Sequence, residues 1–194
     1  MRAEVLERLD LQGWFSAEEG AWYAALAAAA RPGWIVEVGC WKGLSASFLA
    51  PVLRGRPQRL WCVDHWGGST DEHGPAYLES LAREPVRDIF RANMAALGIP
   101  CRVLEAASVD AARQFPDRSC ALVFLDASHD RAAVESDLAA WRPKIAPGGV
   151  LAGHDYRPDY PGVVSAVDSL ARTSGLPLHR GPGSTWSLPF PRNE

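Results

Sequence analysis

The chain alternates short apolar runs with segments of helical pattern, and this order constrains its fold more than any other feature. The strand-like runs are residues 34–39, 59–64, 101–106, 120–126 and 148–153. Between them, helical patterns fall at residues 44–53, 85–97, 109–114 and 131–145. Short apolar strands that alternate with helices form a parallel sheet with both faces covered. The sequence therefore predicts an α/β fold with a mainly parallel sheet.

The two ends of the chain extend this plan. Near the N-terminus, the stretch Ser16–Glu19 has the spacing of a capping box, so we expect a helix over Ala17–Ala30. Near the C-terminus, a helical pattern over 162–175 precedes two short strand-like segments around 176–180 and 184–190. A Gly-Pro-Gly connection separates these segments, which predicts an antiparallel hairpin at the sheet edge.

The length of the chain indicates how many domains it forms, and its charge indicates which partners it can bind. The chain has 194 residues, of which 47% are hydrophobic, and a formal net charge of -3. This length predicts a single domain over 1–194, with an N-terminal helical cap over 1–32 and the core over 33–194. Without a basic surplus, nucleic acid is not expected as the main partner. Because no apolar stretch could span a bilayer and the charged N-terminus lacks a signal-peptide core, we expect a cytoplasmic protein with no membrane contact.

The longest stretch without a regular pattern covers residues 66–85. It follows the second strand, so it should hang over the carboxyl ends of the strands, where open α/β sheets bind ligands. A loop of this length inside a compact domain is usually functional or mobile. The sequence therefore predicts a functional loop there.

The first strand ends in the stretch Glu37-Val38-Gly39-Cys40-Trp41-Lys42-Gly43, where a carboxylate and two glycines precede a helix. Gly39 allows a tight turn and a close approach of a ligand to the backbone. A phosphate-binding P-loop fits poorly, because the second glycine comes one residue too soon and Leu44 follows it. A dinucleotide fingerprint fits poorly, because Trp41 stands where its second glycine belongs. Two interpretations remain: a merely tight turn, or a cradle for a ligand with both an ammonium and a carboxylate, such as S-adenosylmethionine.

The second strand ends in Asp64. A carboxylate at this place can accept hydrogen bonds from both hydroxyls of a ribose, and it disfavours a 2′-phosphate. An aspartate that ends a strand is also a common cap or turn residue. Its register with Glu37 and Gly39 favours the ribose role.

Between about Gly33 and Tyr156, the chain resembles the class I S-adenosylmethionine-dependent methyltransferases. The stretch EVGCWKGLS is similar to the E-x-G-x-x-x-G-x-S form of their first motif, and WCVDHW is similar to their second. The stretch FLDASHDRAAVESDLAAWRPKIAPGGVLAGHDY resembles a bacterial branch related to catechol-type and macrolide-sugar O-methyltransferases. The resemblance implies a Rossmann-like core with a mainly parallel seven-stranded sheet, helices on both faces and a C-terminal antiparallel hairpin.

The resemblance also implies a cofactor site, residue by residue. Gly39 and Gly43 would line the methionine end of S-adenosylmethionine, and Ser45 would hydrogen-bond its carboxylate. Glu37 would fix the turn or meet the cofactor through water. Further implied contacts are Asp64 at the ribose, His65 beside the adenine, Ser108 at the adenine, Trp41 as a stacking or wall residue, and Asp126 beside the cofactor. For Ser108, an N-cap role for the following helix stays open.

In catechol-type relatives, the acid that ends the fourth strand and two polar residues after the fifth bind a divalent cation. Asp126, His154 and Asp155 match those positions, which implies the metal ligands. Two carboxylates with one imidazole suit Mg²⁺, Mn²⁺ or another first-row ion better than a structural zinc. His129 stands where these relatives carry a basic side chain, and an imidazole can accept a hydroxyl proton. His129 and Asp126 are therefore the expected catalytic residues.

Two departures from related bacterial sequences leave the metal open. Ala127 replaces a glycine and Arg131 replaces a tyrosine that these sequences often carry, and the pair after the fifth strand is His-Asp instead of Asp-Asn. A structural role for His154 and Asp155 in steadying a loop therefore remains an alternative.

The predicted function is transfer of the S-adenosylmethionine methyl group to a hydroxyl of a small molecule, with a divalent cation as a further cofactor. A sugar or polyketide-type acceptor is suggested by the resemblance. Two alternatives remain: a metal-independent N-methyltransferase, in which Asp126 and His129 hold an amine, and a non-catalytic cofactor-binding partner subunit. The segment 1–30 could cover the active site or pair with a second chain in a homodimer.

Overall fold

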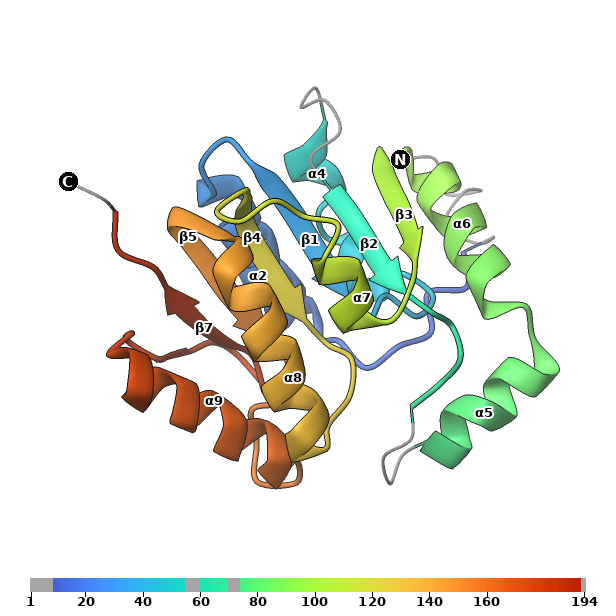
Figure 1. Ribbon diagram of the computed structural model, residues 1–194. Coiled ribbons are helices and arrows are strands. Elements are labelled where there is room, and N and C mark those ends of the chain that lie inside the picture. Colours follow the sequence, from blue (N-terminus) through green and yellow to red (C-terminus); the bar gives the residue numbers. More distant parts are fainter. Residues whose placement is uncertain (1–8, 55–59, 70–73, 193–194) are drawn as a thin grey trace.

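The fold centres on one seven-stranded sheet with the strand order β3-β2-β1-β4-β5-β7-β6 (Figure 1). The structure is a computed structural model that describes residues 9–54, 60–69 and 74–192. The strands are β1 (Trp34–Val38), β2 (Leu60–Asp64), β3 (Cys101–Glu105), β4 (Cys120–Leu125), β5 (Ile145–Gly153), β6 (His179–Arg180) and β7 (Trp186–Pro189). Strands β1 to β5 pair in parallel. Strand β7 pairs antiparallel with both β5 and β6. The expected mainly parallel sheet and its antiparallel C-terminal hairpin are therefore confirmed.

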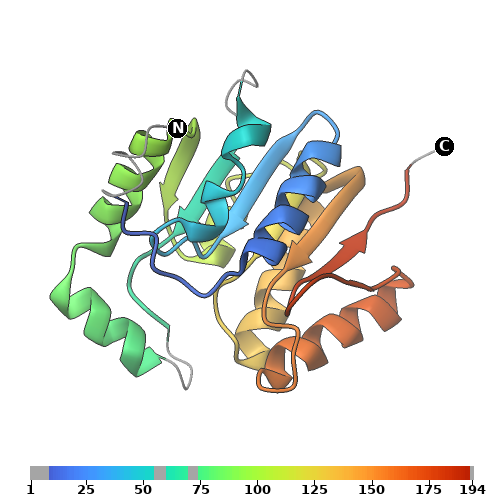
Figure 2. The same cartoon turned by 180° about the vertical axis from the view of Figure 1, so that it is seen from behind.

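Helices cover both faces of the sheet. One face carries α7 (Ser108–Ala112), α8 (Arg131–Trp141) and α9 (Pro161–Ser174), which lie in front of the sheet in Figure 1. The opposite face, seen in Figure 2, carries α2 (Ala17–Ala29), α3 (Leu44–Ser47), α4 (Ala50–Leu53) and α6 (Val86–Leu97). In the described ranges, every helix is too short or too polar to cross a bilayer.

Each face of the sheet has its own hydrophobic core. On the side of α7, α8 and α9, the fully buried Trp141 and Trp186 are the largest side chains. On the other side, Tyr23 of α2 stacks on Phe124 of β4 with ring centroids 4.3 Å apart, and Phe90 of α6 is fully buried. Strands buried on both faces need apolar residues at consecutive positions, which explains why they read as continuous apolar runs.

The expected irregular stretch over 66–85 is corrected in its second half, where α5 (Gly74–Arg83) forms. Tyr77 of this helix packs edge-on against Trp14 and Trp41, with ring centroids 5.3 Å away in each case. A short helix gains most of its stability from such tertiary contacts, and these partners lie far from α5 in the sequence. The segment is amphipathic, so its local pattern did carry a helix signal, which the expectation of a loop overlooked.

Prolines account for two further differences from the expected element bounds. The helix expected over 44–53 divides into α3 and α4, and Pro51 lies in the first turn of the second piece. The helix expected over 131–145 ends at Trp141, and a 3-10 turn over Arg142–Lys144 contains Pro143. Proline lacks the N–H that a helix interior requires, so each helix breaks there. Strand β5 consequently begins three residues earlier than the run 148–153, at Ile145.

The parallel ladder brings the ends of β1, β4 and β5 together at one edge. The backbone N–H of Asp126 donates to the carbonyl of Val38 at 2.8 Å. The backbone N–H of His154 donates to the carbonyl of Leu125 at 3.0 Å. The residues that follow these three strands therefore lie side by side, in the order β1, β4, β5.

Candidate cofactor and metal site

A cavity of about 750 Å³ opens at the carboxyl edge of the sheet. Its wall comes from segment 13–15, from the turns that follow β1 to β5, and from the inner side of α8. The predicted site residues in this wall are Gly39, Trp41, Ser45, Asp64, His65, Ser108, Asp126, His129, His154 and Asp155. Glu37 and Gly43 lie behind the wall instead. The structure thus gathers all but two of the predicted site residues around one space.

The two glycines after β1 are required by their surroundings. Both have a φ of 87°, a conformation that disfavours side chains. A Cβ on Gly39 would lie 1.8 Å from the carbonyl oxygen of Asp126, so two turns of backbone touch at this point. A Cβ on Gly43 would lie 2.4 Å from Cε of Met94, so Gly43 lets α3 begin against α6.

Asp64 joins the turns after β1 and β2. Its Oδ2 accepts hydrogen bonds from the backbone N–H groups of Cys40 at 2.8 Å and Trp41 at 3.0 Å. Its Oδ1 accepts one from the N–H of Trp66 at 2.7 Å. A carboxylate offers about four acceptor positions, so about one remains for a ligand. His65 is exposed at the rim, where its Nδ1 accepts the N–H of Gly67 at 2.8 Å.

Glu37 is fully buried beneath the first turn. Its Oε1 accepts the hydroxyl proton of Ser45 at 2.8 Å. Burial raises the pKa of Glu37 to about 8, because a carboxylate loses its hydration there and only part of that loss is recovered from Ser45. The side chain is therefore protonated at neutral pH and has an O–H of its own to donate.

Ser108 belongs to a buried polar group that includes Asp137, a residue that sequence reasoning missed. The Ser108 hydroxyl oxygen accepts the indole N–H of Trp141 at 3.0 Å. Asp137 of α8 lines the cavity, and burial raises its pKa to about 6 against the opposing hydrogen bond from Ser108. The N-cap alternative for Ser108 is wrong, because Ala107 occupies the cap position. Asp137 shares one face of α8 with Val134, Leu138 and Trp141, and an acid at this helical spacing among apolar residues was the available sequence signal.

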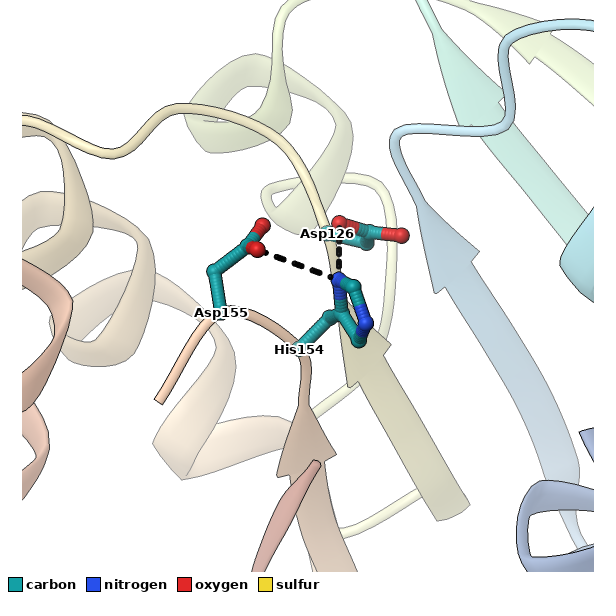
Figure 3. A group of neighbouring side chains, drawn as sticks. All are labelled: Asp126, His154 and Asp155. Carbon is teal, nitrogen blue, oxygen red and sulfur yellow. Dashed lines mark ion pairs between the residues drawn. The ribbon is translucent and has the colours of Figure 1, made fainter. Parts of the chain in front are cut away.

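Asp126, His154 and Asp155 converge at the carboxyl ends of β4 and β5 (Figure 3). His154 Nδ1 lies 3.6 Å from Oδ1 of Asp126 and 3.3 Å from Oδ1 of Asp155. One possible ligand atom from each residue lies within 4.8 Å of the others. Asp155 adopts a φ of 61°, which an aspartate tolerates at some cost and which turns its carboxylate toward the group. The donor set, two carboxylates and one imidazole, fits a divalent cation.

Electrostatics ties the three residues together. Burial raises the pKa of Asp126 above its ordinary value, although His154 opposes the rise. Burial would also raise the pKa of Asp155, but hydrogen bonds from His129 and His154 outweigh it and hold that pKa well below its ordinary value. Burial would lower the pKa of His154, yet the two facing carboxylates raise it to about 11. Without a cation, an imidazolium therefore balances the acidic charge.

His129 lies in the cavity wall beside this group. Its Nε2 is 3.0 Å from Oδ2 of Asp155, and its ring packs on Tyr160 with centroids 4.6 Å apart. The carboxylate on one side and the aromatic ring on the other fix the orientation of the imidazole. The structure thus brings together all four residues predicted for catalysis and metal binding.

Glu19, on helix α2, reaches the same group from behind, and sequence reasoning gave it only a helix-capping role. The capping box itself is confirmed, since Ser16 Oγ accepts the Glu19 N–H and Glu19 Oε2 accepts the Ser16 N–H. The other oxygen, Oε1, lies 3.0 Å from Nε2 of His154. It also accepts the backbone N–H of Ser184 at 3.0 Å.

Aromatic side chains form the outer rim of the cavity. Trp14 packs on Trp41 with ring centroids 6.0 Å apart, and Tyr77 contacts both. The indole N–H of Trp66 donates to the carbonyl of Trp41 at 3.0 Å, which holds that turn in place. Trp14 is 59% exposed, so part of this aromatic surface remains open to a ligand.

The strand order, with its single antiparallel hairpin, and the cavity beyond the carboxyl ends of the strands define a class I methyltransferase fold. Residues 36–156 match a family model described as a methyltransferase domain. The chain belongs to this family, and it is an S-adenosylmethionine-dependent methyltransferase. None of the curated proteins compared with the chain matches it significantly.

Solved structures of methyltransferases share the fold at low sequence identity. The O-methyltransferase NovP is 20% identical, with a TM-score of 0.69, over 90% of this chain and 79% of that one. CalS11, a TDP-rhamnose 3′-O-methyltransferase, is 19% identical, with a TM-score of 0.60, over 97% of this chain and 87% of that one. An O-methyltransferase from Bacillus cereus, solved in complex with SAH, is 16% identical, with a TM-score of 0.65, over 97% of this chain and 92% of that one.

Proposed function

We propose that this protein transfers the methyl group of S-adenosylmethionine to a hydroxyl of a small molecule at a divalent metal centre. The observation that carries the proposal is the convergence of Asp126, His154 and Asp155 on one point of the cavity, within 4.8 Å of one another. The turns that hold Gly39 and Asp64 line the same cavity. Cofactor and acceptor could therefore meet in one enclosed space, as in-line transfer requires.

The cofactor would lie along the turns after β1 and β2. The bare backbone at Gly39 would admit its methionine end, and the remaining acceptor position of Asp64 would take a ribose hydroxyl. Ser45, whose hydroxyl donates to the buried Glu37 at 2.8 Å, would use its oxygen and the nearby backbone of α3 to position the methionine end of the cofactor. Ser108, with Asp137 behind it, would meet the adenine.

The residues of the metal centre would act on the acceptor. Asp126, His154 and Asp155 would hold the cation, which lowers the pKa of a bound hydroxyl and orients it. His129, held by its contact with Asp155, would take up the hydroxyl proton as methyl transfer proceeds.

The acceptor would enter across the aromatic rim of Trp14, Trp41 and Tyr77. Aromatic faces bind the apolar faces of sugar rings and flat polyketide-type rings alike. The similarity to CalS11, described as a TDP-rhamnose 3′-O-methyltransferase, supports the sugar class first.

The test is methyl transfer from radiolabelled S-adenosylmethionine to a panel of sugar, phenolic and amine acceptors. We expect incorporation into a hydroxyl acceptor, a drop of at least about tenfold in EDTA, and recovery with Mg²⁺ or Mn²⁺. Asp155→Ala should lose the metal-dependent part of the rate. Asp159→Ala removes an exposed acid that pairs with Arg157 in the same loop, and it should retain the full rate.

Two results would contradict this assignment. Transfer to amines that EDTA leaves unchanged would identify a metal-independent N-methyltransferase. Tight binding of S-adenosylhomocysteine without transfer to any acceptor would favour the non-catalytic subunit.

A further inference from the structure

Glu19 lies directly behind His154, and we propose that its carboxylate positions this imidazole as a metal ligand. Glu19 Oε1 is 3.0 Å from His154 Nε2, while the opposite ring nitrogen, Nδ1, faces Asp126 and Asp155. The inference rests on the proposed metal centre. It concerns a residue that touches neither cofactor nor acceptor and acts only through His154.

Hydrogen bonding around Glu19 fixes its role as an acceptor. Its Oε2 accepts the backbone N–H of Ser16 at 2.7 Å, and its Oε1 accepts that of Ser184 at 3.0 Å. An ionised carboxylate offers no proton, so the hydrogen of the contact with His154 belongs to Nε2. A neutral imidazole with its proton on Nε2 carries its lone pair on Nδ1, and Nδ1 is the nitrogen aimed at the two aspartates.

With a cation bound at Nδ1, Glu19 would stand behind the ligating imidazole, a relay of carboxylate, imidazole and metal that is common in metalloproteins. A carboxylate behind a ligating histidine selects the tautomer and holds the ring at the angle that coordination needs. Phe15 packs on the His154 ring with centroids 5.1 Å apart, which limits rotation of the ring. The position of Nδ1 is thus set by Glu19 and Phe15 together, before any cation binds.

The surroundings of Glu19 are shaped for this contact beyond what a helix cap requires. The capping box uses only Oε2 and the backbone of Ser16. A Cβ on Gly183 would lie 2.1 Å from Glu19 Oε1, so a side chain there would push the carboxylate away from this connection between β6 and β7. The backbone N–H of Ser184 donates to Glu19 Oε1, and the Oγ of Ser184 accepts the backbone N–H of Asp155 at 3.2 Å. One residue of the hairpin therefore braces both Glu19 and a predicted ligand.

The test is calorimetric titration of Mn²⁺ into the full chain saturated with S-adenosylhomocysteine. Glu19→Ala should weaken Mn²⁺ binding about 10- to 100-fold, the usual effect of removing a partner behind a metal-ligating histidine. Glu19→Gln keeps one acceptor oxygen and should lose less. The matched control Ser16→Ala breaks the same capping box without touching His154, so it should lower the melting temperature while leaving Mn²⁺ affinity unchanged.

Nitrogen-15 NMR of His154 supplies a readout that a merely structural role would not move. With Mg²⁺ bound, the Nε2 proton of the wild type should lie far downfield, as a hydrogen bond to a carboxylate produces, and Glu19→Ala should lose that shift. Wild-type affinity in both Glu19 variants, with the Nε2 proton of Glu19→Ala unshifted from its wild-type position, would overturn the inference alone. Failure of the wild type to bind Mn²⁺ would overturn the metal centre, and the inference with it.

Discussion

Replacement of Gly39 by alanine is expected to lower the free energy of unfolding by at least about 3 kcal/mol, the largest effect of any single methyl group in this site. The new Cβ would lie 1.8 Å from the carbonyl oxygen of Asp126, and backbone on both sides leaves little room to move. The φ of 87° adds the cost of a side chain in a left-handed conformation. Urea unfolding, with the slope checked against the wild type, measures the loss.

Gly98 provides a matched control for this prediction. It also has a positive φ, of 64°, but a Cβ there would meet nothing within 4 Å. Gly98→Ala should therefore cost only the conformational part, about 1–2 kcal/mol. Equal losses in the two variants would show that the close approach of the turns after β1 and β4 does not exist in solution.

Replacement of Asp64 by alanine is expected to weaken binding of S-adenosylhomocysteine at least about 100-fold. This loss corresponds to about 2.7 kcal/mol, the value of one or two hydrogen bonds to a charged group. The variant removes the proposed ribose acceptor and also releases the N–H groups of Cys40, Trp41 and Trp66. Calorimetric titration in EDTA measures the affinity without a contribution from a metal.

Two further variants separate the causes of that loss. Asp64→Asn keeps one oxygen for the backbone donors, so an intermediate loss is expected. Asp117→Ala removes an exposed acid that pairs with Lys144 near the start of β4, at the opposite end of the sheet, and should leave the affinity unchanged. If Asp64→Ala bound the ligand as tightly as the wild type, the ribose site would have to lie elsewhere.

Most of the sheet was predictable because its strands are short, apolar and separated by helices. Burial on both faces imposes that pattern locally, so a single sequence reveals it. Helix α5 was missed although its sequence is amphipathic. Only its contact with Trp14 and Trp41, made through Tyr77, depends on the completed fold. Pro51 and Pro143 carried a local signal that places helix breaks more accurately than apolar periodicity does.

The residues of the site could be predicted where local sequence determines their position, and not where contacts between distant segments determine it. Gly39 and Asp64 follow strands, so their meeting at one edge could be predicted from the parallel sheet alone. The clamp that Asp64 forms on backbone N–H groups could not, because it depends on the paths of two turns. Glu19 was readable only as a helix cap, since its second partner, His154, lies 135 residues further along the chain.

A crystal structure with both ligands would show whether cofactor and metal share one active site. Crystals grown with S-adenosylhomocysteine and Mn²⁺ should show the ligand in the cavity and a single anomalous peak within about 2.5 Å of Asp126, His154 Nδ1 and Asp155. That result would place cofactor and metal in one active site, as the proposed hydroxyl methylation requires. Ligand density without an anomalous peak at these three residues, or a peak held by other side chains, would contradict the account.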